Sequence, residues 1–313
     1  ERVSIATRLA DLQDGARVEI ERSDGDRLIL PAGADDLAAV LIDHPDATIV
    51  AGATDVGLWV TKFMQDISPA VFISHIAELH QIKEAGNGIT IGAGVTYTEL
   101  EKVVADRFPQ MHEFWSRIGG EQVRNMGTVG GNIANGSPIG DTPPALIALG
   151  ASVTLRRGPD RRTVQLEDFF IDYGKQDRHP DEFVESVHIP FPAEDDRFAV
   201  YKVSKRRDED ISSVCGAFRV RLSNDVVADA VIAFGGMAAT PKRAQEAEAA
   251  LVGKAWTEDA ARDAQASLAR DFAPISDWRA SSEYRALVAG NLMRRFWLET
   301  AGEPVRLDRE AVA

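Results

Sequence analysis

Two glycine-containing segments combine residue types that suit phosphate binding. In the first, an apolar run leads into a helical pattern through Ile49-Val-Ala-Gly-Ala-Thr-Asp-Val56. Such a turn directs successive backbone N–H groups and a helix N-terminus at one point, where an anion can bind. Gly52 and Ala53 would let a ligand approach the backbone closely, and Thr54 could bind a phosphate. An ordinary strand–helix turn capped by Thr54 would explain the same residues.

The second segment places glycines beside side chains that donate and accept hydrogen bonds. It reads Gly127-Thr-Val-Gly-Gly-Asn-Ile-Ala-Asn-Gly-Ser-Pro-Ile-Gly-Asp141, and Asp141 could accept a pair of ribose-type hydroxyls. We predict that residues 119–141 are loop-like, and a loop of this length is more often functional than filler. A plain surface loop would explain the polar residues but not Ile133 and Ile139.

A charged run lies further along the chain, at Lys202-Val-Ser-Lys-Arg-Arg-Asp-Glu-Asp-Ile211. Its composition is typical of a solvated loop between two strands. Lys202 is different because it lies inside an apolar strand pattern, between Tyr201 and Val203. A lysine at such a position either extends to solvent or meets an anion.

The composition excludes several classes of protein. The 313 residues carry 35 Lys and Arg against 49 Asp and Glu, a net charge of −14, so nucleic-acid binding is not expected. Cys215 is the single cysteine, which leaves no cysteine-based metal or iron–sulfur site. The six histidines form no pair at ligand spacing, so we expect no metal site. The sequence shows no membrane span and no signal peptide, which predicts a cytoplasmic protein without membrane contact.

The first half of the chain alternates short apolar runs with helix signals. Asp35 and Asp36 begin a helix that Pro45 ends, and 23–26 is a possible hairpin turn. The other expected elements are strands at 48–52, 70–74, 89–93, 151–156 and 184–189 and helices at 54–64, 96–104 and 143–150. A capping box in Thr96-Tyr-Thr-Glu99 would open the helix at 96–104.

The pattern changes after a polar stretch at 191–196, which we take as a domain boundary. Three long strands and then three helical segments follow, which indicates a separate α+β domain. We expect the strands at 198–205, 213–221 and 226–234, and helices that start near Pro241, Thr257 and Ser281.

Together these segments resemble the FAD-binding module of the molybdenum hydroxylases, and specifically of xanthine dehydrogenases. AGATDVG and GTVGGNIANGSPIGD match the two FAD loops of that family in residue type and order. Leu30-Pro31 and Phe234-Gly-Gly-Met237 extend the match, which persists to about Thr300. The run KxSxRRDxDI favours xanthine dehydrogenase over the carbon monoxide and nicotine dehydrogenases that share the module.

The resemblance implies an α+β (mixed α/β) fold, with an FAD-binding domain of the vanillyl-alcohol-oxidase type before a smaller α+β domain. That second domain would have a three-stranded antiparallel sheet and helices. The implied divisions are a lead-in linker at 1–26, the FAD domain at 27–193, the C-terminal domain at 197–302 and a tail at 303–313.

The resemblance also implies a role for particular residues. Val184 would touch the flavin through its backbone, and Lys202 would reach it from the second domain. Animal members place a Phe against the flavin where this chain has Ile118, so we do not expect their dehydrogenase-to-oxidase switch here. The FAD contacts would come from Ile49, Val50, Ala51, Gly52, Ala53, Thr54, Asp55, Val56, Ile118, Thr128, Gly130, Gly131, Asn132, Asn135, Ser137, Asp141, Val184 and Lys202, and NAD would approach Arg206, Arg207 and Asp210.

The implied activity is electron transfer through FAD from a partner's iron–sulfur cluster to NAD⁺. The iron–sulfur clusters and the molybdopterin centre, where a purine is hydroxylated, would lie on partner chains or domains, in a hetero-oligomer. Three alternatives stay open: the flavoprotein of another molybdenum hydroxylase acting on carbon monoxide, an aldehyde or nicotine; a self-sufficient FAD oxidoreductase of the same fold; and a flavin-free scaffold subunit.

Overall fold

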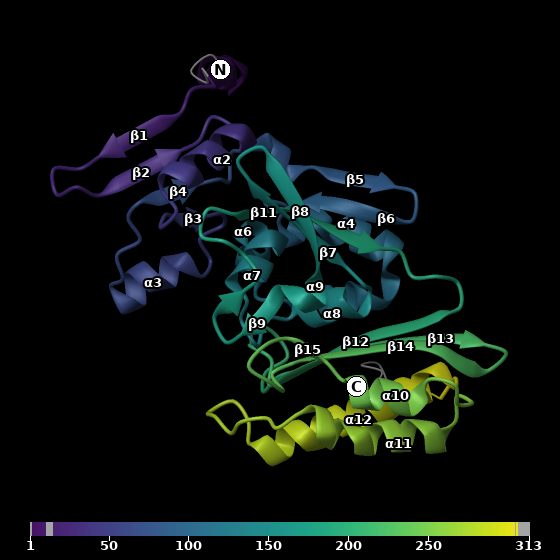
Figure 1. Cartoon of the computed structure of the whole chain (residues 1–313). Helices are drawn as coiled ribbons and strands as arrows, with labels where there is room; N and C mark the ends of the chain where they lie inside the picture. Colours follow the sequence, from purple (N-terminus) through teal and green to yellow (C-terminus); the bar gives the residue numbers. More distant parts are fainter. Residues whose placement is uncertain (1, 11–14, 304, 306–313) are drawn as a thin grey trace.

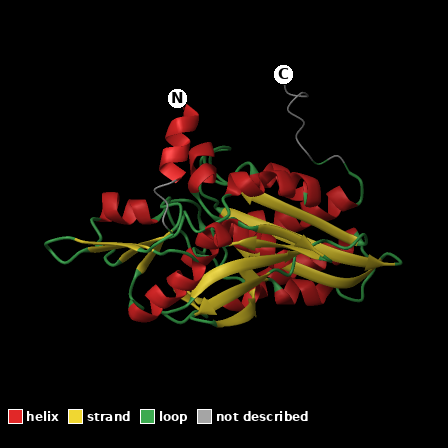
Figure 2. Ribbon diagram, turned by 90° about the horizontal axis from the view of Figure 1, so that it is seen from above, coloured by secondary structure: helices red, strands yellow, loops and turns green. Residues whose placement is uncertain are grey.

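A computed structural model of the chain describes residues 2–10, 15–303 and 305 (Figure 1). Three main sheets organise it: a small sheet near the N-terminus, a five-stranded central sheet and a C-terminal sheet backed by helices. Figure 2 shows the small sheet at one end of the molecule, away from the long C-terminal strands. Among the described residues, no helix is long and apolar enough to cross a membrane.

The small sheet has the strand order β1-β2-β4-β3. Strands β2, β4 and β3 run parallel, and β1 pairs antiparallel with β2 through the expected turn at 23–26. Part of the predicted lead-in linker is therefore an edge strand of this sheet. The elements of this region are α1 (Arg2–Ala10), β1 (Val18–Glu21), β2 (Arg27–Leu30), α2 (Ala34–Asp43), β3 (Thr48–Val50), α3 (Val56–Phe63), β4 (Ala70–Phe72) and η1 (Ala77–His80).

The central sheet is antiparallel, with the order β5-β6-β11-β7-β8. Its strands are β5 (Ile82–Ala85), β6 (Gly88–Gly92), β7 (Ser152–Arg157), β8 (Asp160–Gln165) and β11 (Phe183–Pro190). Around it lie α4 (Tyr97–Arg107), η2 (Pro109–Met111), α5 (His112–Trp115), α6 (Glu121–Met126), α7 (Val129–Asn135), α8 (Thr142–Ala148), α9 (Leu166–Phe169) and the hairpin of β9 (Phe170–Asp172) and β10 (Lys175–Gln176).

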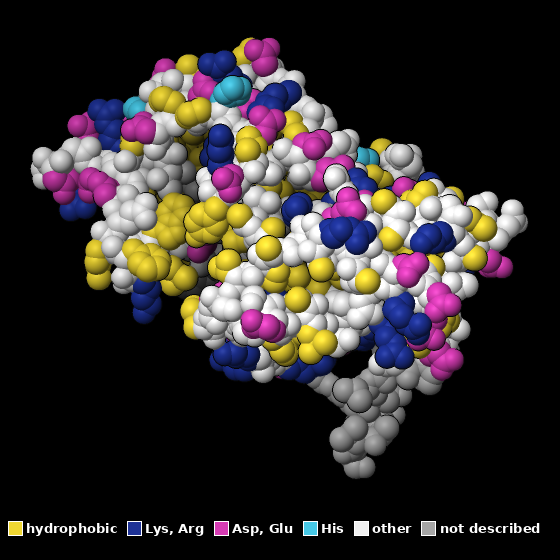
Figure 3. Space-filling model, turned by 60° about the horizontal axis from the view of Figure 1, so that its bottom comes forward, with side chains coloured by type: hydrophobic (Ala, Val, Ile, Leu, Met, Phe, Trp, Pro, Cys, Tyr) yellow, Lys and Arg dark blue, Asp and Glu magenta, His cyan; other side chains and the backbone are white. Residues whose placement is uncertain are grey.

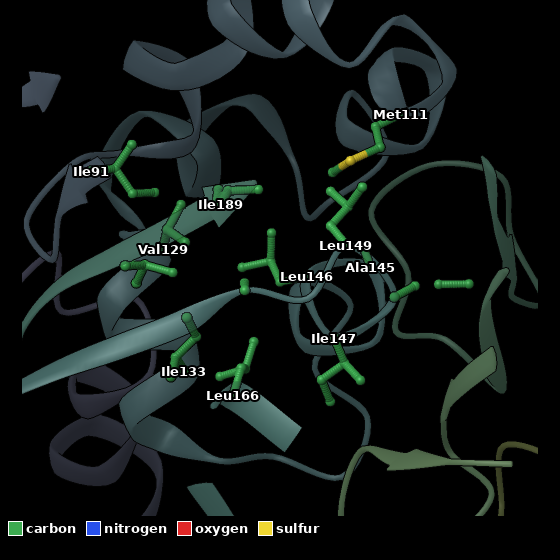
Figure 4. Close-up of a cluster of buried hydrophobic side chains, with 14 of the residues drawn as sticks. Ile91, Met111, Val129, Ile133, Ala145, Leu146, Ile147, Leu149, Leu166 and Ile189 are labelled. Atoms are coloured by element: carbon green, nitrogen blue, oxygen red, sulfur yellow. The ribbon is translucent and has the colours of Figure 1, made fainter. Parts of the chain in front are cut away.

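Helix α8 lies in the centre of the largest hydrophobic core. Each of its residues from Thr142 to Ala148 is buried. Figure 4 shows Leu146 of α8 among Val129 and Ile133 of α7 and Ile189 of β11. The same core continues into the inner face of the C-terminal sheet through Phe198 and Val200. Burial of these side chains fixes α7 and α8 against both sheets.

The C-terminal sheet consists of three long antiparallel strands and a two-residue fourth strand. The fourth strand, β15, was not expected from the sequence and pairs with the end of β14. One face of the sheet packs on three helices (Figure 1). The elements are β12 (Asp196–Val203), β13 (Val214–Ser223), β14 (Val226–Gly235), β15 (Lys242–Arg243), α10 (Gln245–Leu251), α11 (Glu258–Asp271) and α12 (Ser282–Thr300).

The expectation of a continuous loop at 119–141 was wrong, because α6 and α7 lie within it. Helix α7 forms despite two glycines, since Thr128 caps its N-terminus and Val129 and Ile133 are fully buried. Tertiary packing here outweighs the low helix propensity of glycine. Helix α3 also begins two residues later than predicted, at Val56. The expected capping box is present at the start of α4.

Candidate cofactor-binding site

The two glycine segments meet in space although about seventy residues separate them in the sequence. A Cβ atom on Gly52 would lie 1.6 Å from the carbonyl oxygen of Met126, at the end of α6. A Cβ atom on Gly127 would lie 3.4 Å from the Thr54 hydroxyl oxygen. The backbone turn after β3 therefore packs directly on the entrance to α7, and only glycine fits at position 52.

The first segment presents the N-terminus of α3 to solvent. Ala53 adopts a left-handed conformation with φ 56°, which turns the chain sharply between β3 and the helix. Asp55 occupies the N-cap position without a side-chain cap hydrogen bond. Residues 53–55 are exposed. An exposed helix start with a free cap position suits an anion such as a pyrophosphate.

The second segment presents the N-terminus of α7 beside it. Thr128 caps this helix, and its hydroxyl accepts a hydrogen bond of 3.0 Å from the Gly131 backbone N–H. Gly130 is required for packing, because its Cβ would lie 2.4 Å from the Cβ of Ala93. Gly131 is exposed, and its Cβ would meet the Thr128 side chain alone. The two adjacent glycines thus have different roles: Gly130 allows α7 to pack against Ala93, and Gly131 leaves room for a ligand.

Asn132 carries a buried acceptor that the described residues do not satisfy. Its Oδ1 atom lies out of solvent and has no hydrogen-bond partner. Buried side-chain oxygens almost always accept a hydrogen bond, so a donor from a bound molecule would complete this one. Asn135 is exposed one turn further on, and the Ser137 hydroxyl accepts a hydrogen bond from Ile139 N–H. The glycines, the helix N-termini and the unpaired amide oxygen together fit FAD.

Asp141 and Lys202 form a buried ion pair across the boundary between the two halves of the chain. Lys202 Nζ lies 2.5 Å from one carboxylate oxygen of Asp141, and the Ser212 hydroxyl lies 2.5 Å from the other. The Lys202 side chain is 1% exposed. Of the two possibilities for this lysine, the structure shows that it meets an anion. The sequence did not reveal that the anion is Asp141, and both oxygens of that carboxylate are engaged within the protein.

Arg117 connects the same region to the charged loop. Its guanidinium donates to the carbonyl oxygen of Lys202 at 2.9 Å and to that of Arg207 at 3.2 Å. Burial lowers the pKa of Arg117 below its usual value. Sequence reasoning missed this residue, because its partners lie more than eighty positions away and no motif marks it.

The charged loop after β12 is a folded turn. Asp210 accepts a hydrogen bond of 2.8 Å from Arg206 N–H, which holds the pKa of that carboxyl below its usual value. The side chains of Arg206 and Arg207 are 71% and 47% exposed. The three residues predicted to meet NAD therefore lie together, with both guanidinium groups open to solvent.

The remaining predicted contacts are buried or half-buried. Ile118 and Val184 are 6% and 5% exposed, and β11 has a register shift next to Val184. Ala93 N–H donates to the carbonyl oxygen of Glu185 at 3.0 Å, so this bulge lies beside the backbone on which Gly130 packs. Within the first segment Val50 is buried and Ile49, Ala51 and Val56 are half-buried.

Tyr97 is a buried polar residue at this junction that the sequence did not single out. Its hydroxyl lies 2.7 Å from that of Thr142, and its backbone N–H donates to Gly127 at 3.2 Å. Burial raises the pKa of Tyr97, so the phenol stays protonated. The two hydrogen bonds of Tyr97 connect α4 to α8 and to the start of α7. Among the described residues, no group of three or more His, Cys, Asp or Glu is placed to hold a metal ion.

Comparison with known families agrees with this geometry. A family described as "FAD binding domain in molybdopterin dehydrogenase" matches residues 20–192. A second, "CO dehydrogenase flavoprotein C-terminal domain", matches residues 199–300. The chain belongs to the FAD-binding family of the molybdopterin dehydrogenases, and the resemblance drawn from its sequence motifs is confirmed.

Individual relatives differ in how much of their length the chain covers. It is 34% identical over 231 residues to the glyceraldehyde dehydrogenase medium chain of Sulfolobus acidocaldarius, covering 73% of this chain and 82% of that one. It is 29% identical over 307 residues to a xanthine dehydrogenase/oxidase of Rattus norvegicus, covering 92% of this chain but 23% of that protein. Across several xanthine dehydrogenases that it matches, the chain covers 17% to 24% of the relative's length.

Solved structures show the same architecture. A chain of the carbon monoxide dehydrogenase from Hydrogenophaga pseudoflava is 28% identical, with a TM-score of 0.81 over 89% of this chain and 96% of that one. Quinoline 2-oxidoreductase from Pseudomonas putida 86 gives a TM-score of 0.79 at 26% identity, over 87% of this chain. The predicted fold class, an FAD-binding domain followed by a smaller sheet-and-helix domain, is confirmed.

Proposed function

We propose that this chain is the FAD-carrying unit of a xanthine dehydrogenase and delivers electrons to NAD⁺. The observation that carries the proposal is the charged loop at 204–210. Arg117 holds its backbone against Lys202, and two of its guanidinium groups face solvent beside the cofactor region. The loop carries three basic and three acidic residues, but the guanidinium groups of Arg206 and Arg207 are exposed. Exposed guanidinium groups next to a flavin suit a dinucleotide, whose pyrophosphate is an anion. The motif of this loop is the one that favours xanthine dehydrogenases.

We assign each part of the FAD molecule to a different group of residues. We assign the diphosphate and ribityl chain to residues 49–56 and 128–132, and the remaining contacts to Asn135, Ser137 and Asp141. Ile118, Val184 and Lys202 would adjoin the isoalloxazine. FAD, when bound, supplies a centre that accepts electrons singly and releases them as a hydride. In this scheme the FAD domain is 27–193 and the C-terminal domain is 197–302.

The electron donor must come from outside this chain. One cysteine cannot ligate an iron–sulfur cluster. We therefore propose partner chains or domains that carry iron–sulfur clusters and molybdopterin, in a cytoplasmic hetero-oligomer. Helix α3 supports such a partner, because no residue in it is buried and Phe63 is 73% exposed. Figure 3 shows hydrophobic side chains gathered on the side of the molecule where α3 lies. An apolar surface that continues directly from the FAD-binding turn is suited to a donor that must lie close to the flavin.

An anaerobic reduction experiment tests the proposed acceptor. The purified chain is loaded with FAD, and its visible bands are followed after NADH is added without any organic substrate. We expect the flavin bands to bleach. Bands that bleach with dithionite but not with NADH would contradict the proposal and favour another acceptor.

A second candidate is an aldehyde dehydrogenase flavoprotein. It is favoured by the 34% identity to a glyceraldehyde dehydrogenase medium chain, whose length the chain matches better than that of the xanthine dehydrogenases. The substrate would be selected at the molybdenum centre of the partner. Copurifying that partner and assaying purine against aldehyde oxidation with a dye acceptor separates the two candidates.

A further inference from the structure

A tight turn between α11 and α12 presents an exposed tryptophan beside the charged loop. Trp278 is 74% exposed, and its carbonyl oxygen accepts a hydrogen bond of 2.8 Å from Lys205 Nζ. Lys205 follows Lys202 by three residues, a span of at most ~11 Å of extended chain. The hydrogen bond from Lys205 therefore links Trp278 directly to the charged loop, and places it near Lys202, which is expected to adjoin the flavin.

The turn is held rigidly. One oxygen of Asp277 accepts hydrogen bonds from Arg279 N–H at 2.9 Å, Ala280 N–H at 3.0 Å and the Arg285 guanidinium at 2.7 Å. Arg285 is 1% exposed and also donates to the carbonyl oxygen of Gly236 at 2.9 Å. A buried arginine thus anchors the turn to the C-terminal sheet. An exposed aromatic ring on such a fixed support loses little conformational entropy when it binds a ligand.

The surroundings of the ring have the character of a nucleotide site. The Arg279 guanidinium lies 4.0 Å from the centre of the Trp278 ring, and Trp278 is nevertheless 74% exposed. Trp278 lines a cavity of about 450 Å³ together with Lys205, Ser213, Asp277, Arg279 and Tyr284. Stacking on an aromatic face holds a base, and guanidinium groups pair with phosphates. Asp210 and Asp277 are the nearby carboxylates, and backbone N–H groups and arginines engage both.

We propose that Trp278 and Arg279 form the binding site for the adenosine half of the dinucleotide acceptor. The adenine stacks on the indole, and Arg279 and the exposed Arg206 meet the pyrophosphate. This inference rests on the proposed transfer of electrons to NAD⁺, because it places the other half of the same ligand toward Lys202. A concave site with a cationic rim fits a small anionic ligand better than the flat face of a partner protein.

Calorimetric titration with 5′-AMP and with ADP-ribose tests this site without any redox step. Both ligands should bind the full FAD-loaded chain. Trp278→Ala should weaken binding roughly 5- to 100-fold, the range measured for loss of one base stack. Trp278→Phe should restore part of the affinity. Ile275→Ala is the matched control, since Ile275 is 73% exposed near the turn but does not line the cavity.

Two results would overturn the inference. Either neither ligand binds the unaltered chain, or Trp278→Ala binds both as tightly as Ile275→Ala does. If NADH still bleaches the flavin in either case, the proposed function stands and the adenosine site lies elsewhere. If NADH fails to bleach the flavin while 5′-AMP binds through Trp278, the nucleotide site stands and the acceptor assignment fails.

Discussion

The two segments predicted to hold FAD are built in different ways. The first, at 49–56, leads into α3, which buries none of its residues. The second, at 127–141, contains α7 and leads into α8, which is buried along its whole length. One segment is an exposed arm, and the other is part of the core.

This difference separates binding from folding. Changes in the second segment alter the packing of both halves of the chain, because Asp141 pairs with Lys202 across the domain boundary. Changes at the exposed positions 53–55 of the arm act on the ligand, whereas Val50 is buried and Gly52 touches α6. The segments should therefore respond differently to substitution.

The largest effect is expected at the buried ion pair. Asp141→Ala leaves the Lys202 ammonium buried without its counter-ion, which should lower the unfolding free energy by about 3–5 kcal/mol. The double variant Asp141→Leu/Lys202→Met removes both charges and should be distinctly more stable than Asp141→Ala. Denaturant unfolding measures both. Equal stability of Asp141→Ala and the unaltered chain would contradict the buried pair.

The next effect is expected where the arm meets the core. Gly52→Ala places a methyl group against the Met126 carbonyl. It should lower the free energy of unfolding by about 1–3 kcal/mol and also weaken FAD binding. Gly57→Ala is the matched control, because its Cβ would meet nothing within 4 Å. That control should be neutral or stabilising by up to about 1 kcal/mol. Thermal unfolding and flavin content distinguish the two; similar values for both would show that the segments do not touch.

Gly131→Val should affect the ligand more than the fold. Its side chain projects into the space left for the cofactor, and within the protein its Cβ meets the Thr128 hydroxyl oxygen at 2.7 Å, which strains the cap of α7. We expect flavin content to fall at least about tenfold, while the unfolding free energy of the FAD-free chain falls by no more than about 2 kcal/mol, the cost of losing one cap. A fully flavin-loaded variant would refute the placement of the cofactor against α7.

The smallest effect is expected from one exposed hydroxyl of the arm. Thr54→Ala removes a hydrogen-bonding group worth about 0.5–1.5 kcal/mol, so FAD should bind roughly 2- to 10-fold more weakly with unchanged stability. Thr61→Ala is the control, since the Thr61 hydroxyl bonds to Gly57 within α3. Fluorescence titration with FAD compares them, and an identical affinity would remove Thr54 from the site.

Much of this arrangement was predictable from the sequence because it is local. Apolar spacing predicted α2 and the long strands β12, β13 and β14, and the turn and capping signals around 23–26 and Thr96 were correct. The loop at 119–141 was mispredicted because glycine propensity is local, whereas the burial of Ile133 depends on distant residues. The Asp141–Lys202 pair and the role of Arg117 were out of reach for the same reason.

The central claim is that the exposed arm and the buried segment together form one FAD site. Titrating the FAD-free chain with FAD, followed by its visible absorption, tests that claim most directly. The account predicts saturation at one FAD per chain, and loss of binding in both Gly52→Ala and Gly131→Val. The account would be contradicted if the unaltered chain remains colourless at saturating FAD, or if both variants bind FAD as tightly as the unaltered chain.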